Sequence, residues 1–310
     1  MTNIKVGSVF RFAFSDDLQY FYKINAYGVH ALKLSGDDMS VKDRTIWRCV
    51  PLKNASNITF SEGRLFVSNT IGELTSLHAA TGKLCWKNEP RGEGEGPLVL
   101  HDGALLQTTW GGECLRIDTA SGRVIYHVKC PHKILRLFPT SDFGKIAVES
   151  SIQPAASHLP ITTTLRNLDT ESLAISKTVI ERQSSFFAVD SSGRYLVSDQ
   201  VIVETGDKPQ DRARRLEVID LAASQSLSER VMTKNSSPTS RLIWSPRTSL
   251  ISFRSRSGSK RLHGLSLVDL DSLDNGSTHI LGYSQDGSRV VLEGKNDTFI
   301  AYSDEHLLTA

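Results

Sequence analysis

The residues best suited to binding chemistry are the cationic side chains of two polar segments in the second half of the chain. These segments, residues 204–214 and 255–263, contain or directly adjoin Lys208, Arg212, Arg214, Arg215, Arg254, Arg256, Lys260 and Arg261. Guanidinium and ammonium groups donate charge-assisted hydrogen bonds to carboxylates. This composition predicts a surface that binds a partner protein with an acidic surface.

A third segment, residues 150–160, is apolar, contains proline and carries His158. Arginine beside apolar side chains is typical of protein interfaces. Two other interpretations stay open. One is that all three segments are solvated loops without a partner. The other is nucleic-acid binding, although the segments lack interleaved aromatic residues and the net charge of +2 gives no bulk attraction.

The nine histidines and four cysteines form no metal-ligand pattern. No two histidines are spaced i, i+2 or i, i+4, and Cys49, Cys85, Cys114 and Cys130 include no Cys-x-x-Cys pair. No Ser/His/Asp or Cys/His constellation can be recognised either. We therefore expect no metal, no cofactor and no catalytic residue. The first three cysteines lie in strand-like runs and are expected to be buried free thiols.

Recurring short turns set the positions of these segments along the chain. In the clearest of these turns, an apolar residue is followed by Ser or His, then by Asp or Glu, and then in most cases by Gly. Seven turns of this kind, at residues 15–17, 61–63, 101–103, 141–144, 190–193, 245–247 and 284–287, are spaced 40 to 54 residues apart. Asp-Gly and Ser-Gly supply the positive-φ positions of tight hairpins. About four short strands and no convincing helix fit into each repeat, which is the pattern of a β-propeller blade.

The sequence therefore predicts an all-β fold, a seven-bladed β-propeller with four-stranded blades, in which residues 1–310 form a single domain. The expected blades are residues 7–50, 51–90, 91–131, 132–182, 183–234, 235–279 and 280–310, with six or eight blades as alternatives. The last unit supplies only three strands, so we expect the N-terminal strand around residues 3–6 to complete it. Closing the ring removes exposed sheet edges.

The sequence SLHAATGKLCW, residues 76–86, resembles the repeat of quinoprotein-type (pyrroloquinoline-quinone-like) β-propellers, roughly Ala-x-Asp-x-x-Thr-Gly-Lys-x-x-Trp. Residues 116–126 are a degraded second copy that ends in Tyr126, and the later units look more like WD40-type repeats. The resemblance implies that Trp86, and likewise Trp47, anchor neighbouring blades to each other. It implies a fold and does not by itself imply a function.

Quinoprotein dehydrogenases are the enzymes that this repeat suggests. They are exported, larger and eight-bladed, hold calcium and quinone on the axis, and often use an adjacent Cys-Cys disulfide. This chain has 310 residues and no adjacent cysteines, so we expect no quinone-dependent catalysis. A hydrolase- or lyase-type site at the axial channel is the alternative. The expected innermost strands are mostly apolar, and Arg11, Arg136 and Arg241, without an accompanying acid, predict a weak axial anion site.

In a propeller, segments 150–160, 204–214 and 255–263 belong to consecutive blades, so enlarged loops there would cluster on one face. We therefore expect a non-catalytic propeller that captures another protein, as a bacterial toxin-neutralising immunity protein or as an assembly scaffold. The N-terminal residues contain no long apolar run and no window approaches a membrane span, so a cytoplasmic location without membrane contact is expected. A monomer is the default oligomeric state.

Overall fold

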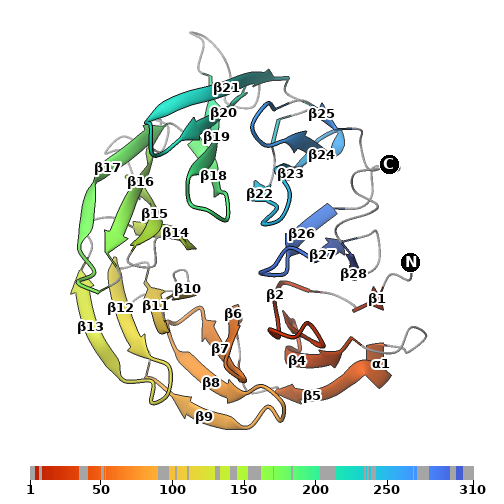
Figure 1. Ribbon diagram of the computed structural model, residues 1–310. Coiled ribbons are helices and arrows are strands. Elements are labelled where there is room, and N and C mark those ends of the chain that lie inside the picture. The colour runs from red at the N-terminus through yellow and green to blue at the C-terminus, as the bar shows by residue number, and fades with distance from the viewer. Residues whose placement is uncertain are drawn as a thin grey trace.

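Strands stand around a central axis in the computed structural model, and one strand of each sheet lies nearest that axis (Figure 1). The structure describes residues 4–6, 9–34, 41–49, 52, 54–89, 98–101, 103–109, 112–129, 133–139, 145–152, 162–169, 171–182, 184–202, 214–233, 235, 237–238, 242–267, 269–270, 279–293 and 298–302. Within these residues the strands pair into seven four-stranded sheets. The predicted all-β propeller with four-stranded blades is therefore confirmed.

Six of the sheets are meanders of four consecutive strands, ordered from the axis outward. Blade 1 contains β2 (Arg11–Phe14), β3 (Tyr20–Asn25), β4 (Gly28–Lys33) and β5 (Thr45–Cys49); blade 2 contains β6 (Ala55–Ser61), β7 (Arg64–Asn69), β8 (Leu74–His78) and β9 (Leu84–Lys87); blade 3 contains β10 (Leu98–His101), β11 (Ala104–Thr108), β12 (Glu113–Asp118) and β13 (Val124–Lys129). Blade 4 contains β14 (Lys133–Pro139), β15 (Lys145–Ile152), β16 (Thr162–Asp169) and β17 (Ile175–Arg182); blade 5 contains β18 (Ser184–Val189), β19 (Tyr195–Val201), β20 (Arg214–Asp220) and β21 (Gln225–Met232); blade 6 contains β22 (Ile243–Trp244), β23 (Leu250–Ser255), β24 (Gly258–His263) and β25 (Asp269–Leu270).

The seventh sheet joins the two ends of the described chain. Blade 7 contains β26 (His279–Tyr283), β27 (Arg289–Glu293) and β28 (Thr298–Tyr302), and β1 (Ile4–Lys5) is its outermost strand. Ile4 pairs with Ile300 and Lys5 with Phe299, in antiparallel register. The N-terminal strand therefore closes the ring by hydrogen bonds rather than by a covalent link, and β1 lies beside β28 (Figure 1).

Much of the core lies between neighbouring blades. Tyr22 and Ala31 of blade 1 pack in one cluster with Leu65 and Leu77 of blade 2. Because neighbouring blades cover both faces of a middle strand, such strands are buried along most of their length; β3 and β7 are examples. Each blade thus depends on its neighbours to remove its apolar surface from water.

Two local expectations need correction. A short helix, α1 (Val41–Arg44), precedes β5, although the sequence predicted no helix. Cys85 is exposed and Cys49 is half-buried, and only Cys114 is fully buried among the described free cysteines. The physical reason is that β5 and β9 are the outermost strands of their blades, where solvent covers one side. Among the described residues there is no helix long and apolar enough to cross a membrane.

The segment 255–263 is not the enlarged loop that its Ser, Gly, Lys and Arg content predicted. β23 and β24 form a tight hairpin in which Ser255 pairs with Gly258, so only Arg256 and Ser257 make the turn. The polar residues continue into a strand because its backbone groups are satisfied by pairing with β23. Residues 153–160 and 204–213 of the other two segments lie outside the described residues.

Candidate functional site

The basic residues predicted for partner binding are dispersed over blades 5 and 6. His158, Lys208 and Arg212 lie outside the described residues. Arg214 and Arg215 open β20 and are both engaged within blade 5. Arg214 forms an ion pair with the buried carboxylate of Asp199, and the Arg215 Nη1 lies 3.3 Å from Glu229 Oε2.

Blade 6 distributes its four predicted cations between surface and interior. Arg254 and Arg256 are exposed and Lys260 is half-buried. The prediction of a surface role for Arg261 is wrong, because its side chain is only 2% exposed. It pairs with Ser252 across the hairpin. Burial raises the pKa of Tyr283 in blade 7, and the Arg261 guanidinium opposes that rise.

Of the three arginines predicted to form an axial anion site, only the side chain of Arg11 is described. It is exposed at the start of β2, and its Nη1 donates a 2.9 Å hydrogen bond to the carbonyl oxygen of Phe10. Arg136 belongs to β14, and Arg241 lies outside the described residues. The cluster of three therefore stays a prediction.

One cavity brings together residues from the two separate predictions. It has a volume of about 470 Å³ and lies where blades 6, 7 and 1 meet, at the N-terminal ends of β2 and β26. We call it the arginine pocket; its lining is Arg11, Arg254, His279, Glu293, Phe10, Phe12, Leu242, Ile243, Ile280 and Leu281. Thus Arg254, predicted for partner binding, and Arg11, predicted for an axial site, line the same pocket.

The polar side of the arginine pocket carries a net positive charge. Burial and the Arg254 guanidinium lower the pKa of His279, while Glu293 opposes that shift. The Nδ1 atom of His279 is hydrogen bonded to Ser259 Oγ. With His279 neutral, two guanidinium groups face one carboxylate, which favours an anionic group such as a carboxylate entering the pocket.

Sequence reasoning did not find His279 and Glu293, which line the arginine pocket together with Arg11. The two residues face each other as a cross-strand pair of β26 and β27. His279 is the first residue of β26, the innermost strand of blade 7, as Arg11 is the first residue of β2 in blade 1.

The two tryptophans implied as anchors lie at the junctions of blades 1, 2 and 3. Trp47 Nε1 donates a 2.8 Å hydrogen bond to the carbonyl oxygen of Ala79. Trp86 Nε1 donates a 3.0 Å bond to the carbonyl oxygen of Thr119. Tyr126, at the corresponding place in the degraded copy, is 47% exposed. Each indole thus links the outermost strand of one blade to a turn of the next.

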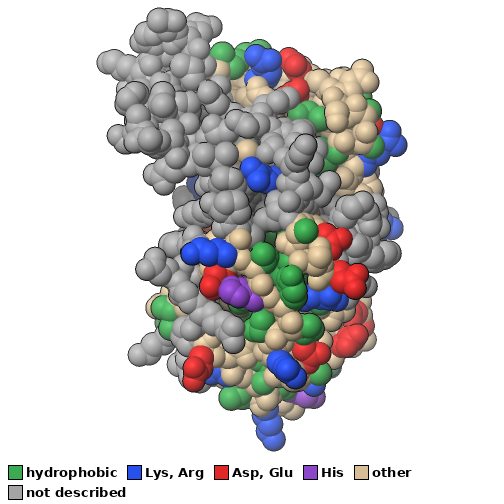
Figure 2. Space-filling model, turned by 90° about the vertical axis from the view of Figure 1, so that its left-hand side faces the viewer, with side chains coloured by type: hydrophobic (Ala, Val, Ile, Leu, Met, Phe, Trp, Pro, Cys, Tyr) green, Lys and Arg blue, Asp and Glu red, His purple; other side chains and the backbone are tan. Residues whose placement is uncertain are grey.

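Charge elsewhere on the ring is mixed in sign. Figure 2 shows the side that carries β13 and β17, where Lys, Arg, Asp and Glu side chains are scattered among hydrophobic ones in the described part. Within the residues that the structure describes, no three His, Cys, Asp or Glu side chains gather as metal ligands would.

Residues 38–201 match the protein family described as outer membrane protein assembly factor BamB. Two curated relatives bear that name. The one from Moranella endobia is 28% identical over 137 residues, which cover 41% of this chain and 35% of the relative. The one from Nitrosomonas eutropha is 29% identical over 91 residues, which cover 29% of this chain and 22% of the relative. The matched segments are thus a minor part of each relative.

Two solved structures resemble the fold over nearly the whole chain. The WD40 domain of Neurospora crassa Pan2 has a TM-score of 0.65 and 13% identity, with 96% of this chain and 90% of that chain covered. A chain of the mitotic checkpoint complex has a TM-score of 0.66 and 13% identity, with 96% and 89% covered. At this identity the likeness concerns the fold alone.

Proposed function

Because this chain belongs to the PQQ-like repeat family described as outer membrane protein assembly factor BamB, we propose that it is a non-catalytic scaffold that holds a partner protein. Propellers present rigid surfaces built from loops and strand ends, and such surfaces suit binding. The relatives are named as assembly factors. Their name supports a role in assembly for this chain.

The observation that carries the proposal is the chemistry of the arginine pocket. Arg11 and Arg254 offer charge-assisted hydrogen bonds, and Phe10, which is 59% exposed, offers apolar contact beside them. A protein surface with an Asp or Glu next to a large apolar side chain complements this pocket in charge and polarity. The partner would therefore dock on the face where β2 and β26 begin.

The finer role within protein binding has two versions. In an assembly scaffold, the partner is a component of a larger complex; in an immunity protein, it is a toxin. The relatives' names favour the first version. The cytoplasmic location expected from the sequence stays a prediction in either case. Identification of the captured partner distinguishes the two versions, because only a toxin loses an activity on binding.

An enzyme with its site at the axial channel is the second candidate. The observation that favours it is the presence of His279 and Glu293 in a cavity that also holds two arginines. Imidazole and carboxylate can transfer protons. A scaffold forms a stable stoichiometric complex with an unchanged partner, whereas an enzyme releases an altered one. Mass spectrometry of the partner after incubation separates the two.

Charge reversal in the arginine pocket tests the scaffold role. The partner is identified by affinity capture and mass spectrometry, purified, and titrated against wild type, Arg11→Glu and Arg254→Glu. We expect each variant to weaken binding about tenfold or more, which corresponds to about 1.4 kcal/mol. Lys83→Glu, an exposed change on a turn of blade 2, is the matched control and should bind normally. Unchanged affinity in both pocket variants, with the fold intact by thermal denaturation, would refute the site.

A further inference from the structure

A second recess lies at the opposite end of the inner strands. β2 runs from Arg11, in the arginine pocket, to Phe14, and the turn that follows it lines a different cavity of about 580 Å³ among blades 7, 1 and 2. This cavity shares Ser15, Asp16 and Phe60 with an adjoining cavity, also about 580 Å³, between blades 1 and 2. Together they form one continuous depression, which we call the acidic groove.

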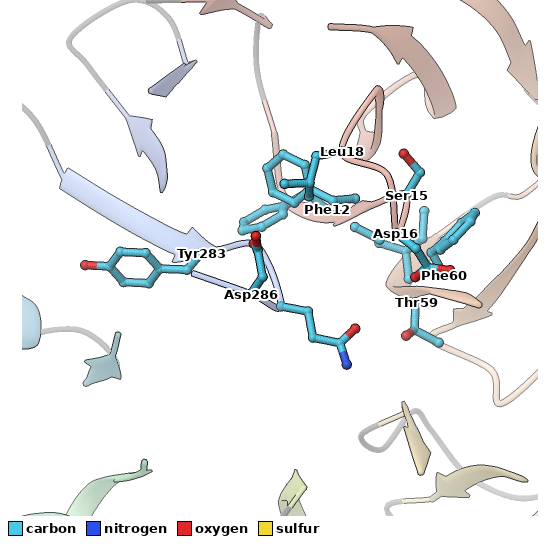
Figure 3. A pocket seen from close by; sticks show the side chains of 12 residues that line it. Phe12, Ser15, Asp16, Leu18, Thr59, Phe60, Tyr283 and Asp286 are labelled. Atoms are coloured by element: carbon cyan, nitrogen blue, oxygen red, sulfur yellow. The ribbon is translucent and has the colours of Figure 1, made fainter. Parts of the chain in front are cut away.

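The floor of the acidic groove is apolar and built on rigid strands. Phe14, Leu18, Ile58 and Phe60 line it and are all half-buried. The ring of Phe60 stacks on that of Tyr22, with centroids 5.6 Å apart. Because these rings are fixed by the core, they can contact a ligand without ordering themselves first. Figure 3 shows that Phe12, Leu18 and Phe60 border the opening, whereas Tyr283 points away from it.

The rim of the groove carries four carboxylates, those of Asp16, Asp17, Glu62 and Asp286. Two of them are held by their own turns. Asp17 accepts a 2.6 Å hydrogen bond from Ser15 Oγ, and Asp286 accepts one of 2.6 Å from Ser284 Oγ. The bond from Ser15 lowers the pKa of Asp17, so this carboxylate is ionised at neutral pH.

Asp16 is the carboxylate best placed to meet a ligand. It is exposed, lines both cavities, and makes no hydrogen bond or ion pair within the described part of the chain. Figure 3 places it across the opening from Asp286. The basic side chains on this rim are fewer. Of Arg64 and His78, the former already donates hydrogen bonds of 3.3 and 2.9 Å to the carbonyl oxygens of Thr119 and Ala120 in blade 3.

We propose that the acidic groove binds an extended peptide segment of a second protein in which Lys or Arg side chains lie next to aromatic or large aliphatic ones. The cations pair with the rim carboxylates, and the apolar side chains cover Phe14, Leu18 and Phe60. An anionic segment is repelled by the same rim. A neutral apolar segment gains the floor contacts but leaves the carboxylates without counter-charges.

This site goes beyond the scaffold role assigned to the arginine pocket. The two recesses lie at opposite ends of β2 and have opposite charge, so they select partners of opposite chemistry. Phe12 lines both of them. A chain with two such sites holds two partners at once, one acidic and one basic, on the two faces of a single ring.

Selection from a random peptide-display library tests the proposal. The full chain is the bait, and peptides that bind the display support alone are removed. We expect the enriched sequences to have an excess of Lys and Arg adjacent to aromatic or large aliphatic residues. The enriched peptide should bind Asp16→Lys and Glu62→Lys about tenfold or more weakly, and its affinity should fall as salt rises from about 0.05 M to about 0.3 M.

Two controls isolate the site. Glu171→Lys makes the same charge change at an exposed turn of blade 4 on the same face and should leave peptide affinity unchanged. Arg11→Glu should also bind the peptide normally, so failure of the scaffold proposal and failure of this one are distinguishable. The proposal is overturned if no peptide is enriched, if the enriched peptides lack the cationic excess, or if Asp16→Lys binds them as wild type does.

Discussion

The indole ring of Trp47 lies against Gly82 of the next blade. A Cβ atom at Gly82 would approach the ring atom Cε3 of Trp47 to 2.6 Å. Trp86 has the same relationship with Gly122, one blade further along, where a Cβ would lie 2.6 Å from the ring. Both glycines have positive φ, +68° and +74°. The glycine in the neighbouring blade is thus needed for two reasons. It leaves room for the indole ring, and it adopts the positive φ that the turn requires.

Gly82→Ala and Gly122→Ala are expected to destabilise the ring by more than the backbone alone requires. A left-handed conformation costs a non-glycine residue about 1–2 kcal/mol, and displacing the indole adds about 1–3 kcal/mol. Gly63→Ala is the matched control, because Gly63 has φ +72° but nothing within 4 Å of an added Cβ. The measurement is the free energy of unfolding from chemical denaturation. Equal losses in all three variants would contradict the docking role of the rings.

Asp199 is expected to make stability depend on pH. Its side chain is fully buried in blade 5, and burial raises its pKa to about 6, even though the Arg214 ion pair opposes the rise. The native carboxyl therefore keeps a proton that the unfolded chain loses near pH 4. The contribution of this group to stability is present below about pH 4 and is lost as pH rises to about 6, a change of roughly 2 kcal/mol.

Asp199→Asn removes this contribution, because an amide does not titrate over that range. Denaturation at pH 4 and pH 7 should therefore show that the loss of stability between the two values is smaller in the variant than in wild type. Asp16→Asn, an exposed carboxylate on a turn, is the control for loss of one negative charge. If Asp199→Asn leaves the difference between the two pH values unchanged, the native carboxyl of Asp199 is already ionised at pH 4 and burial does not raise its pKa.

The charges of the arginine pocket are expected to appear in the titration of His279. Burial and Arg254 lower the pKa of this imidazole, and Glu293 raises it. Arg254→Gln should therefore raise the pKa of His279, and Glu293→Gln should lower it. NMR titration of the labelled ring measures both shifts in the intact protein. Shifts in the same direction for both variants would mean that the three side chains do not share one pocket.

The fold could be predicted from the sequence because its information is local and repeated. Ser15 with Asp17 and Ser284 with Asp286 build turns of the same kind, in which the serine hydroxyl donates to the carboxylate two residues later. Such turns depend on a few neighbouring residues. The spacing of these turns along the chain predicts the order of the blades and the position of each inner strand, because every repeat packs against its neighbours in the same way.

The site could be predicted only in part, because it depends on contacts between distant residues. Arg254 was identified from its charge, but Arg261, seven positions later, has the same charge and is buried. Which of the two meets solvent is decided by strand alternation and by the neighbouring blade. His279 and Glu293 join the site only through the pairing of β26 with β27, and no local pattern marks them.

The pairing of Ile4 with Ile300 has a consequence for how the protein is made. A ribosome releases the first of these residues long before the second, and until then the open arc exposes an unpaired strand at each border. During synthesis there is therefore a stage at which nearly all of the chain has been made but the ring of blades is still open. Closing the ring requires the pairing of two strands that are almost three hundred residues apart in the sequence. This step is slow and costs conformational entropy. Until it is complete, the unpaired strands can pair with those of another copy of the chain.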